Sequence, residues 1–282
     1  MRVTLWGTRG SLPTPGPETA RYGGNTACVE VRGQAGTVLV LDAGTGIRRL
    51  AANLPDSLWR VDVLLTHLHM DHVQGLGFFA PLYRPDIEVH IWGPASLTQS
   101  LPARLTRYLS PPLFPVRLRE LPCILHEVPS GEAAIGEFRV TSALVAHPGP
   151  TVGYRVAAAE GVLVYLPDHE PALGAHPAKF LQREWTSGGA LAAGADLLIH
   201  DSQYDRAEYA SHVGWGHSSL TQAIDFGTLT DVKHLVTFHH DPTHADADLD
   251  RLLAAALAET RPAFPVTPGQ EGATFRIGES PP

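Results

Sequence analysis

An apolar run that ends in a cluster of histidines is the feature that most constrains the fold of this chain. Residues 61–65 (VDVLL) have the pattern of a buried strand, and the segment THLHMDH follows at once. Side chains two positions apart in an extended chain point to the same side. His67, His69 and Asp71 therefore share one side of the strand end. His72 lies beside them, where the chain turns into the next helix.

Two interpretations of this cluster differ in chemistry. A polar turn that caps a helix, with Thr66 or Asp71 as the cap, accounts for one histidine but not for three beside a carboxylate. Imidazole and carboxylate groups without cysteine suit Zn, Mn or Fe. Four ligands within six residues do not wrap one ion, so the spacing favours two. His67 and His69 would bind the first ion. Asp71 and His72 would bind the second.

Short strands and helices continue on both sides of the cluster, in two halves of similar pattern. Hairpins alternate with strand–helix units, which favours two packed mixed sheets over one doubly wound sheet. We therefore expect a layered α/β fold, an αββα sandwich of two mixed β-sheets flanked by helices, in one domain over residues 1–282. The expected strands cover residues 3–6, 27–31, 37–41, 61–65, 87–93, 137–141, 152–156, 161–165, 195–199 and 233–238. The expected helices cover residues 47–54, 73–83, 96–109, 219–229 and 249–260, with an irregular Pro-rich stretch at 111–129 and an insertion at 169–194.

Composition excludes some classes of function. The chain carries 29 acidic and 21 basic residues, so its net charge is −8, which argues against a protein built mainly to hold nucleic acid. No apolar run approaches the length that spans a bilayer, and the start MRVTLWG lacks a secretory pattern. Cys28 and Cys123 lie far apart and are expected as reduced thiols. The sequence therefore favours a cytoplasmic protein without a membrane partner.

The segment THLHMDH resembles the HxHxDH signature of the metallo-β-lactamase superfamily, and later motifs of that family follow in order. The resemblance implies that His147, in LVAHPGP, binds the first ion. Asp168, in VLVYLPDHEP, would bridge both ions, and His239, in LVTFHHDPTH, would bind the second. The expected cofactors are two divalent ions, with zinc as the first choice and manganese as the second.

Three further residues are expected to lie behind the ligands. Asp42, in LDAGTG, matches the early aspartate that braces the metal loop in this family. Thr66 begins that loop, and His240 adjoins the last ligand. Because adjacent side chains alternate, only one of His239 and His240 faces the metals, and we expect His239 to do so.

A later stretch, HDSQYDRAEYASHVGWGHSS, resembles the tRNase Z-like phosphodiesterases, in which an acidic residue pairs with a histidine. The matching residues are Asp201, where the family has glutamate, and His217. A carboxylate that holds one imidazole nitrogen keeps the ring able to donate a proton, which a departing alkoxide needs. The alternative makes His217 a polar residue before the helix at 219–229. The predicted catalytic residues are Asp71, Asp201 and His217.

The resemblance implies a metal-dependent hydrolase, with several substrates to consider. The tRNA-binding arm of tRNase Z usually lies between the third and fourth motifs, whereas His147 and Asp168 leave room only for a hairpin. Together with the negative charge, this favours small cyclic phosphodiesters or nucleotides, with an exonuclease or RNA-processing nuclease as the runner-up. A glyoxalase II-like thioester hydrolase and a metal-binding sensor are the alternatives from other classes. Relatives often form dimers, so a homodimer is a further expectation.

Overall fold

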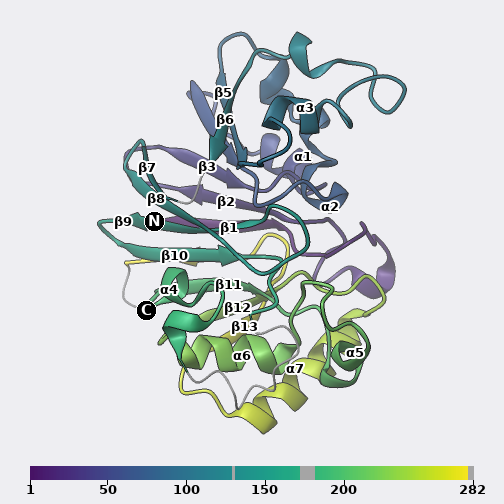
Figure 1. Cartoon of the computed structure of the whole chain (residues 1–282), viewed down its shortest axis with the longest axis vertical. Helices are drawn as coiled ribbons and strands as arrows, with labels where there is room; N and C mark the ends of the chain where they lie inside the picture. Colours follow the sequence, from purple (N-terminus) through teal and green to yellow (C-terminus); the bar gives the residue numbers. More distant parts are fainter. Residues whose placement is uncertain (129–130, 172–181, 279–282) are drawn as a thin grey trace.

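The computed structural model describes residues 1–128, 131–171 and 182–278. Two seven-stranded mixed β-sheets lie against each other, and helices cover their outer faces (Figure 1). This arrangement confirms the expected αββα sandwich. Residues 172–181 of the expected insertion at 169–194 lie outside the described residues.

The first sheet carries the histidine cluster at one of its edges. In spatial order its strands are β14 (Thr274–Arg276), β1 (Arg2–Gly7), β2 (Cys28–Arg32), β3 (Val38–Leu41), β4 (Arg60–Leu64), β5 (Glu88–Pro94) and β6 (Cys123–Val128). Strands β3 to β6 run parallel to one another. Because carboxyl ends of parallel strands meet at one edge, Asp42 after β3 lies beside Thr66 after β4.

The second sheet brings the remaining motifs to the same region. In spatial order its strands are β13 (Val266–Pro268), β12 (Leu235–Phe238), β11 (Leu197–Asp201), β10 (Gly161–Leu166), β9 (Val152–Ala158), β8 (Phe138–Leu144) and β7 (Gly131–Ile135). Strands β10, β11 and β12 are parallel neighbours. Asp168, Asp201 and His239 stand at or just beyond their carboxyl ends.

Seven α-helices are found in the described part of the chain. They are α1 (Ile47–Ala51), α2 (Met70–Val73), α3 (Leu101–Leu105), α4 (Gly189–Ala192), α5 (Arg206–Ser211), α6 (Leu220–Leu229) and α7 (Asp246–Thr260). Short 3-10 turns occur at Pro17–Thr19, Leu76–Phe78, Ala80–Tyr83, Leu118–Glu120 and Arg183–Trp185. Among the described residues, no helix combines the length and apolarity needed to cross a bilayer.

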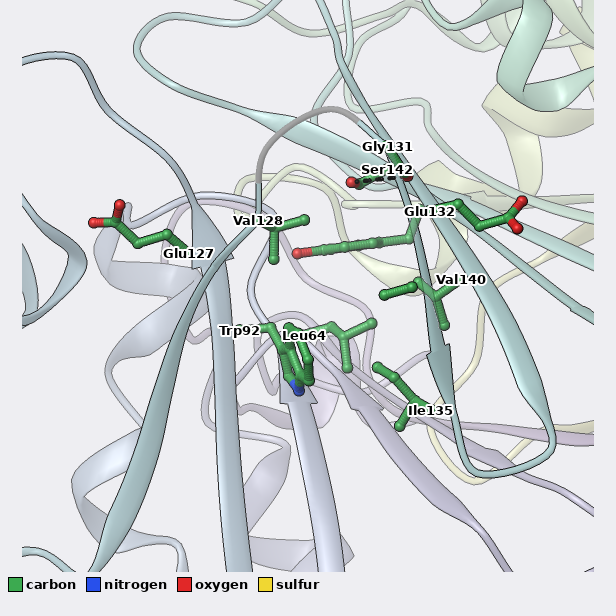
Figure 2. Close-up of a pocket in the computed structure, with 11 residues that line it drawn as sticks. Leu64, Trp92, Glu127, Val128, Gly131, Glu132, Ile135, Val140 and Ser142 are labelled. Carbon is green, nitrogen blue, oxygen red and sulfur yellow. Dashed lines mark hydrogen bonds between the residues drawn. The ribbon is translucent and has the colours of Figure 1, made fainter.

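Alternation along the strands builds three apolar layers. In β3, Leu39 and Leu41 face the central layer between the sheets, while Val38 and Val40 face the layer beneath α1. Both faces of this strand are covered, which explains its uninterrupted apolar sequence. The central layer leaves a cavity of about 130 Å³ between β4–β6 and β7–β9 (Figure 2). None of the described residues that line it is a histidine or an aspartate, so it is separate from the residues of the motifs.

Four expectations about local structure are wrong. The helix expected at 73–83 is replaced by the two 3-10 turns Leu76–Phe78 and Ala80–Tyr83. The helix expected at 96–109 is shortened to α3. Proline is tolerated only in the first turn of a helix, so with Pro102 the helix begins after the Ser100 cap and not at residue 96. The stretch 111–129 is not irregular throughout, because β6 joins the edge of the first sheet beside β5. The edge strands β13 and β14 were not expected, since three residues are too few to show alternation. Cys28 and Cys123 are free thiols, as expected.

Candidate metal centre

The sheet edges bring seven histidine and aspartate residues into two groups that share one carboxylate. The first group consists of His67, His69, His147 and Asp168, and the second consists of Asp71, His72, Asp168 and His239. Within each group, one nitrogen or oxygen atom per residue lies within 4.8 Å of all the others. All seven are residues that the sequence nominated as metal ligands.

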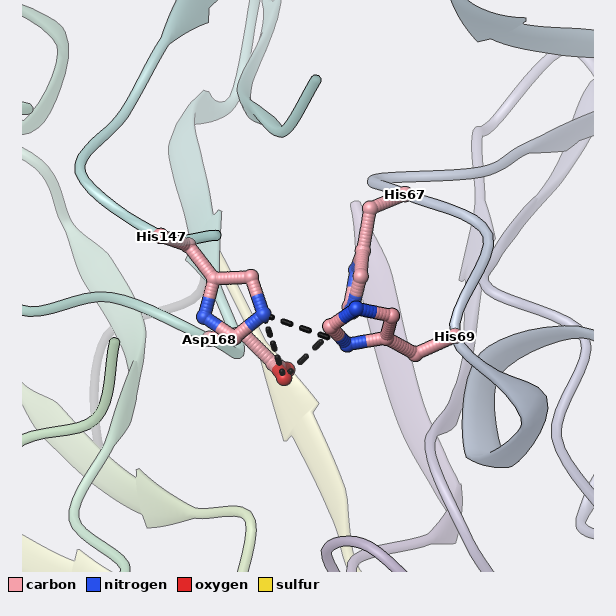
Figure 3. Close-up of side chains that lie close together, drawn as sticks. All are labelled: His67, His69, His147 and Asp168. Atoms are coloured by element: carbon pink, nitrogen blue, oxygen red, sulfur yellow. Dashed lines mark hydrogen bonds and ion pairs between the residues drawn. The ribbon is translucent and has the colours of Figure 1, made fainter. Parts of the chain in front are cut away.

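In the first group, two imidazoles lie near one oxygen of Asp168, and the third lies beside them. The Nε2 atom of His67 lies 3.5 Å from Asp168 Oδ2, and that of His147 lies 3.8 Å from the same oxygen. Figure 3 shows His147 and His69 facing each other beside this carboxylate, with His147 Nε2 3.3 Å from His69 Nδ1. Three nitrogens and an oxygen thus surround a point at the mouth of the site.

In the second group, the other oxygen of Asp168 takes part. His72 Nε2 lies 3.0 Å from Asp168 Oδ1 and 3.3 Å from Asp71 Oδ2. His239 Nε2 lies 3.1 Å from Asp71 Oδ2 and 3.4 Å from Asp168 Oδ1. Asp168 therefore presents one oxygen to each group, which is the geometry that a shared ligand of two neighbouring ions requires.

Unpaired buried atoms at this point fit a divalent metal. Within the described residues, His67 Nε2, His72 Nε2 and Asp168 Oδ1 are buried without a hydrogen-bond partner. Buried polar atoms are nearly always paired, so three converging exceptions indicate a missing partner. Burial holds the pKa of His67 well below its ordinary value, so this ring is neutral, as a metal ligand must be.

The charge balance of the second group also favours a cation. Burial opposes a proton on His72, but the nearby carboxylates of Asp168 and Asp71 outweigh it and raise the pKa of His72 well above its ordinary value. The same carboxylates attract any cation, so a metal ion would compete with that proton. The residues present therefore fit divalent metal binding.

Asp42 braces the first loop from behind. Its carboxylate accepts hydrogen bonds from Thr66 N (2.7 Å), Thr66 Oγ1 (2.9 Å) and Tyr165 OH (3.0 Å). It also accepts one from His72 Nδ1 at 2.8 Å, which fixes the tautomer that leaves His72 Nε2 free for the site. Asp42 has a positive φ of 60°, a conformation that costs free energy in a non-glycine residue and that these four bonds hold in place.

The structure separates the roles of the two adjacent histidines after β12. His239 turns toward the carboxylates, and its Nδ1 donates to Gln203 Oε1 at 3.0 Å. Its φ of 60° is again positive. His240 turns away, and its Nε2 donates to the carbonyl of Gly269 at 2.8 Å. Of the two rings, only that of His239 lies beside Asp71 and Asp168, whereas that of His240 lies behind it.

The N-terminal loop approaches the centre as well. The backbone N–H of Ser11 donates to Asp71 Oδ2 at 2.8 Å. Gly10 lies so close to His239 that a Cβ added there would be 2.3 Å from the ring Nδ1. The guanidinium of the fully buried Arg9 anchors the loop through the carbonyls of Gly23 and His244. Neither Arg9 nor Ser11 was nominated from the sequence.

His217 and Asp201 form the pair expected from the later motif. His217 Nδ1 donates to Asp201 Oδ2 at 2.7 Å, so the short aspartate side chain does reach the ring. The ring stacks on His239 with centroids 4.8 Å apart, and its Nδ1 lies 4.0 Å from Asp168 Oδ2. Burial disfavours the charged ring, but the charge and hydrogen bond of Asp201 prevail and raise the pKa of His217 to about 9. Asp201 thus favours the protonated ring, and the ring lies beside Asp168 and His239.

A buried glutamate that the sequence did not reveal holds the loop before His217. Glu170 is fully buried and accepts hydrogen bonds from Tyr209 OH (2.7 Å), Gly214 N (3.0 Å) and Gly216 N (2.9 Å). The carbonyl of Gly216 in turn accepts from His147 Nδ1 at 2.9 Å. One loop therefore orients both the first group and His217. In the sequence, Glu170 is marked only by its position two residues after Asp168.

Comparisons with known proteins agree with this geometry. A family model described as "Beta-lactamase superfamily domain" matches residues 37–240. The ribonuclease Z of Brevibacillus brevis is 27% identical over 307 residues, covering 95% of this chain and 93% of that protein. The metallo-beta-lactamase fold protein YhfI from Bacillus subtilis superposes with a TM-score of 0.71 at 16% identity, over 97% of this chain and 98% of that one. A diphosphatase from the PhnP family has a TM-score of 0.69 at 17% identity, over 98% and 97%.

Two mixed sheets pack together, and histidines and aspartates gather at the ends of their parallel strands. This arrangement is that of the hydrolases with the metallo-β-lactamase fold. The chain belongs to the beta-lactamase superfamily. The family resemblance of its THLHMDH segment is thereby confirmed.

Proposed function

We propose that this chain is a two-metal phosphodiesterase in which His217 protonates the leaving group. The observation that carries the proposal is the hydrogen bond between His217 and Asp201, set against the shared carboxylate of Asp168. A thioester hydrolase or a metal sensor would need the metal ligands but not this pair. A departing alkoxide does need a proton donor.

The ligand roles follow from the two groups of side chains. His67, His69 and His147 would hold the first ion, and Asp71, His72 and His239 the second, with Asp168 common to both. When bound, two such ions would supply charge neutralisation for the phosphate and an activated water. Imidazole and carboxylate ligands without thiolate suit zinc first and manganese second.

The protein's own contribution to the reaction is the proton. Asp201 holds Nδ1 of His217, so the proton that is transferred lies on Nε2. Transfer of this proton to the leaving oxygen neutralises the alkoxide as its bond to phosphorus breaks. The ring then stays beside Asp201 and regains a proton from solvent.

We further propose that the substrate is a small phosphodiester, such as a cyclic nucleotide. Between His147 and Asp168 the chain forms only the β9–β10 hairpin, with residues 159–160 connecting the two strands. That hairpin leaves no segment to hold a folded RNA, and the net charge of −8 repels one. The runner-up, an RNA-processing nuclease, is favoured by the name of the Brevibacillus brevis relative.

A substrate panel tests this proposal. The protein is stripped with chelator, reloaded with zinc or manganese, and assayed against bis-p-nitrophenyl phosphate, 2′,3′- and 3′,5′-cyclic nucleotides, a tRNA precursor and S-lactoylglutathione. We expect turnover of the small diesters and two ions per chain by metal analysis. Faster cleavage of the tRNA precursor would favour the nuclease, and hydrolysis of the thioester alone would refute the phosphodiesterase.

A matched variant tests the metal ligands. Asp168→Asn keeps the size of the shared side chain but removes its charge, so both ions should bind more weakly. Retention of two ions per chain by this variant would contradict the shared role of Asp168.

A further inference from the structure

A pocket of about 330 Å³ opens beside the first group of metal ligands. His67 and His69 are among the residues that line it. Leu105 and Tyr108 also line it, together with Pro148 and Pro150, which follow His147. An apolar cavity of about 150 Å³ is enough to hold a benzene ring. The pocket therefore has room for a ring with a substituent, next to the reacting phosphate.

The outer part of the pocket exposes apolar side chains to solvent. Met70 is 52% exposed and Leu113 is 70% exposed, and both line the pocket. Apolar surface that stays exposed in a cleft beside polar groups is typical of a ligand-binding site. An apolar group bound here would cover both residues.

Two arginines on the segment that includes α3 give the pocket a positive charge. Arg104 is half-buried; its guanidinium donates to the carbonyl of Pro94, while its Nε is buried without a partner among the described residues. Arg107 lines the pocket and is exposed, and its guanidinium forms no hydrogen bond or ion pair with any residue that the structure describes. Free guanidinium donors favour an anionic ligand.

The position of the pocket identifies which part of a substrate would enter it. Its walls include ligands of the first group, but His217, the proposed proton donor, does not line it. The leaving group has to contact His217, so the pocket is left for the ester arm that remains on the phosphate.

We propose that this pocket binds the non-leaving arm of the phosphodiester, and that this arm is an apolar, ring-sized group that carries an anion. This inference rests on the proposed phosphodiesterase activity. The apolar walls select the ring, and Arg107 with Arg104 selects the anion.

Three p-nitrophenyl phosphodiesters that differ only in the second arm test the inference: methyl, phenyl and 4-carboxyphenyl. Release of p-nitrophenolate reports kcat/KM for each with the metal-loaded enzyme. We expect phenyl to exceed methyl by about tenfold, from burial of the ring. We expect 4-carboxyphenyl to exceed phenyl by a further factor of about two to five, as for one partly exposed ion pair.

Variants of Arg107 test whether this residue causes the preference for the 4-carboxyphenyl ester over the phenyl ester. Arg107→Ala should reduce the ratio of 4-carboxyphenyl to phenyl, and Arg107→Glu should bring it to one or below. Arg119→Ala is the matched control, because Arg119 is exposed on the same connection between β5 and β6 but does not line the pocket. It should leave the ratio and the rates unchanged.

The outcomes are distinguishable. Equal kcat/KM for the methyl and phenyl esters would overturn the apolar arm. A carboxylate preference that is absent in the wild type, or unchanged in Arg107→Glu, would overturn the anion. Turnover of none of the three esters would refute the proposed function, and the pocket's role with it.

Discussion

At the scale of single residues, the role of His217 is testable through the leaving group. His217→Ala should reduce turnover of a 3′,5′-cyclic nucleotide, whose leaving group is an alkoxide, by about 10²- to 10⁴-fold. Turnover of methyl p-nitrophenyl phosphate should fall far less, because p-nitrophenolate leaves without a proton. Comparison of kcat for the two substrates in each variant provides the measurement. Equal losses for both would point to a role other than proton donation.

His240 gives a second residue-scale prediction, on stability. Burial lowers its pKa to about 3, from an ordinary 6.5. Between these values the unfolded chain takes up a proton that the folded chain does not, so the unfolding free energy falls as the pH is lowered through this window. The contribution of one such group is about 1.4 kcal/mol per pH unit.

His240→Gln keeps an N–H donor for Gly269 and removes the titration. Urea unfolding of chelator-treated protein between pH 6.5 and 4.5 should then show a shallower fall for the variant than for the wild type. An equal slope in both proteins would contradict the buried neutral state of His240.

Site residues can be predicted from the sequence when they lie close together along the chain. His67, His69, Asp71 and His72 stand within six residues, so spacing alone nominated them. Glu170 could not be nominated, because its partners lie about 40 residues away in a loop that only the fold brings back. The nominated ligand roles remain predictions until metal analysis tests them.

At the scale of elements, the loop before α6 carries the next prediction. Gly216 has φ of 90°, and a Cβ added there would lie 2.3 Å from His147 Nδ1. Gly216→Ala should therefore displace His147 and weaken metal binding by about 10- to 100-fold, the range seen when groups that orient a ligand are lost.

Gly214 provides a matched control in the same loop. Its φ of 85° carries a similar backbone cost, but a Cβ there would have no atom within 4 Å. Metal titration of the two variants should show weak binding in Gly216→Ala and nearly normal binding in Gly214→Ala. Equal weakening in both would mean that backbone strain, and not contact with His147, is responsible.

Elements whose own sequence has a strong apolar periodicity were predicted well. Elements that depend on pairing with a neighbouring strand were not. The helices at 219–229 and 249–260 recur as α6 and α7, within a few residues at each end. Strand β6 was missed because its residues are only partly buried and its pairing with β5 is its main support. Such a strand has little pattern of its own, so only the sheet defines it.

At the scale of the whole molecule, the metals should stabilise the fold. The proposed ligands of each group come from both sheets, so bound ions would hold the sheets of the folded chain together. A ligand at a hundred times its Kd adds about 2.7 kcal/mol to the unfolding free energy. Chelation should therefore lower Tm, and zinc should restore it. An unchanged Tm after verified metal removal would contradict this link.

The fold class and the superfamily were predictable from the order of the motifs, and the structure and the comparisons confirm them. The single domain over residues 1–282 and the homodimer remain predictions. The pocket beside His69 was not predictable, because residues that line it come from segments some 40 residues apart, near Leu105 and Pro148. No sequence pattern marks surfaces that meet only across the assembled sheets.

The shared position of Asp168 has a kinetic consequence. It lies beyond β10 of the second sheet, yet its carboxylate meets His67 and His72 from the first sheet. The complete centre can exist only after the sheets have docked, and we expect this docking to follow the folding transition state. Metal should then slow unfolding while leaving the refolding rate nearly constant. The ions would therefore slow the unfolding of the folded protein and would not take part in its folding nucleus.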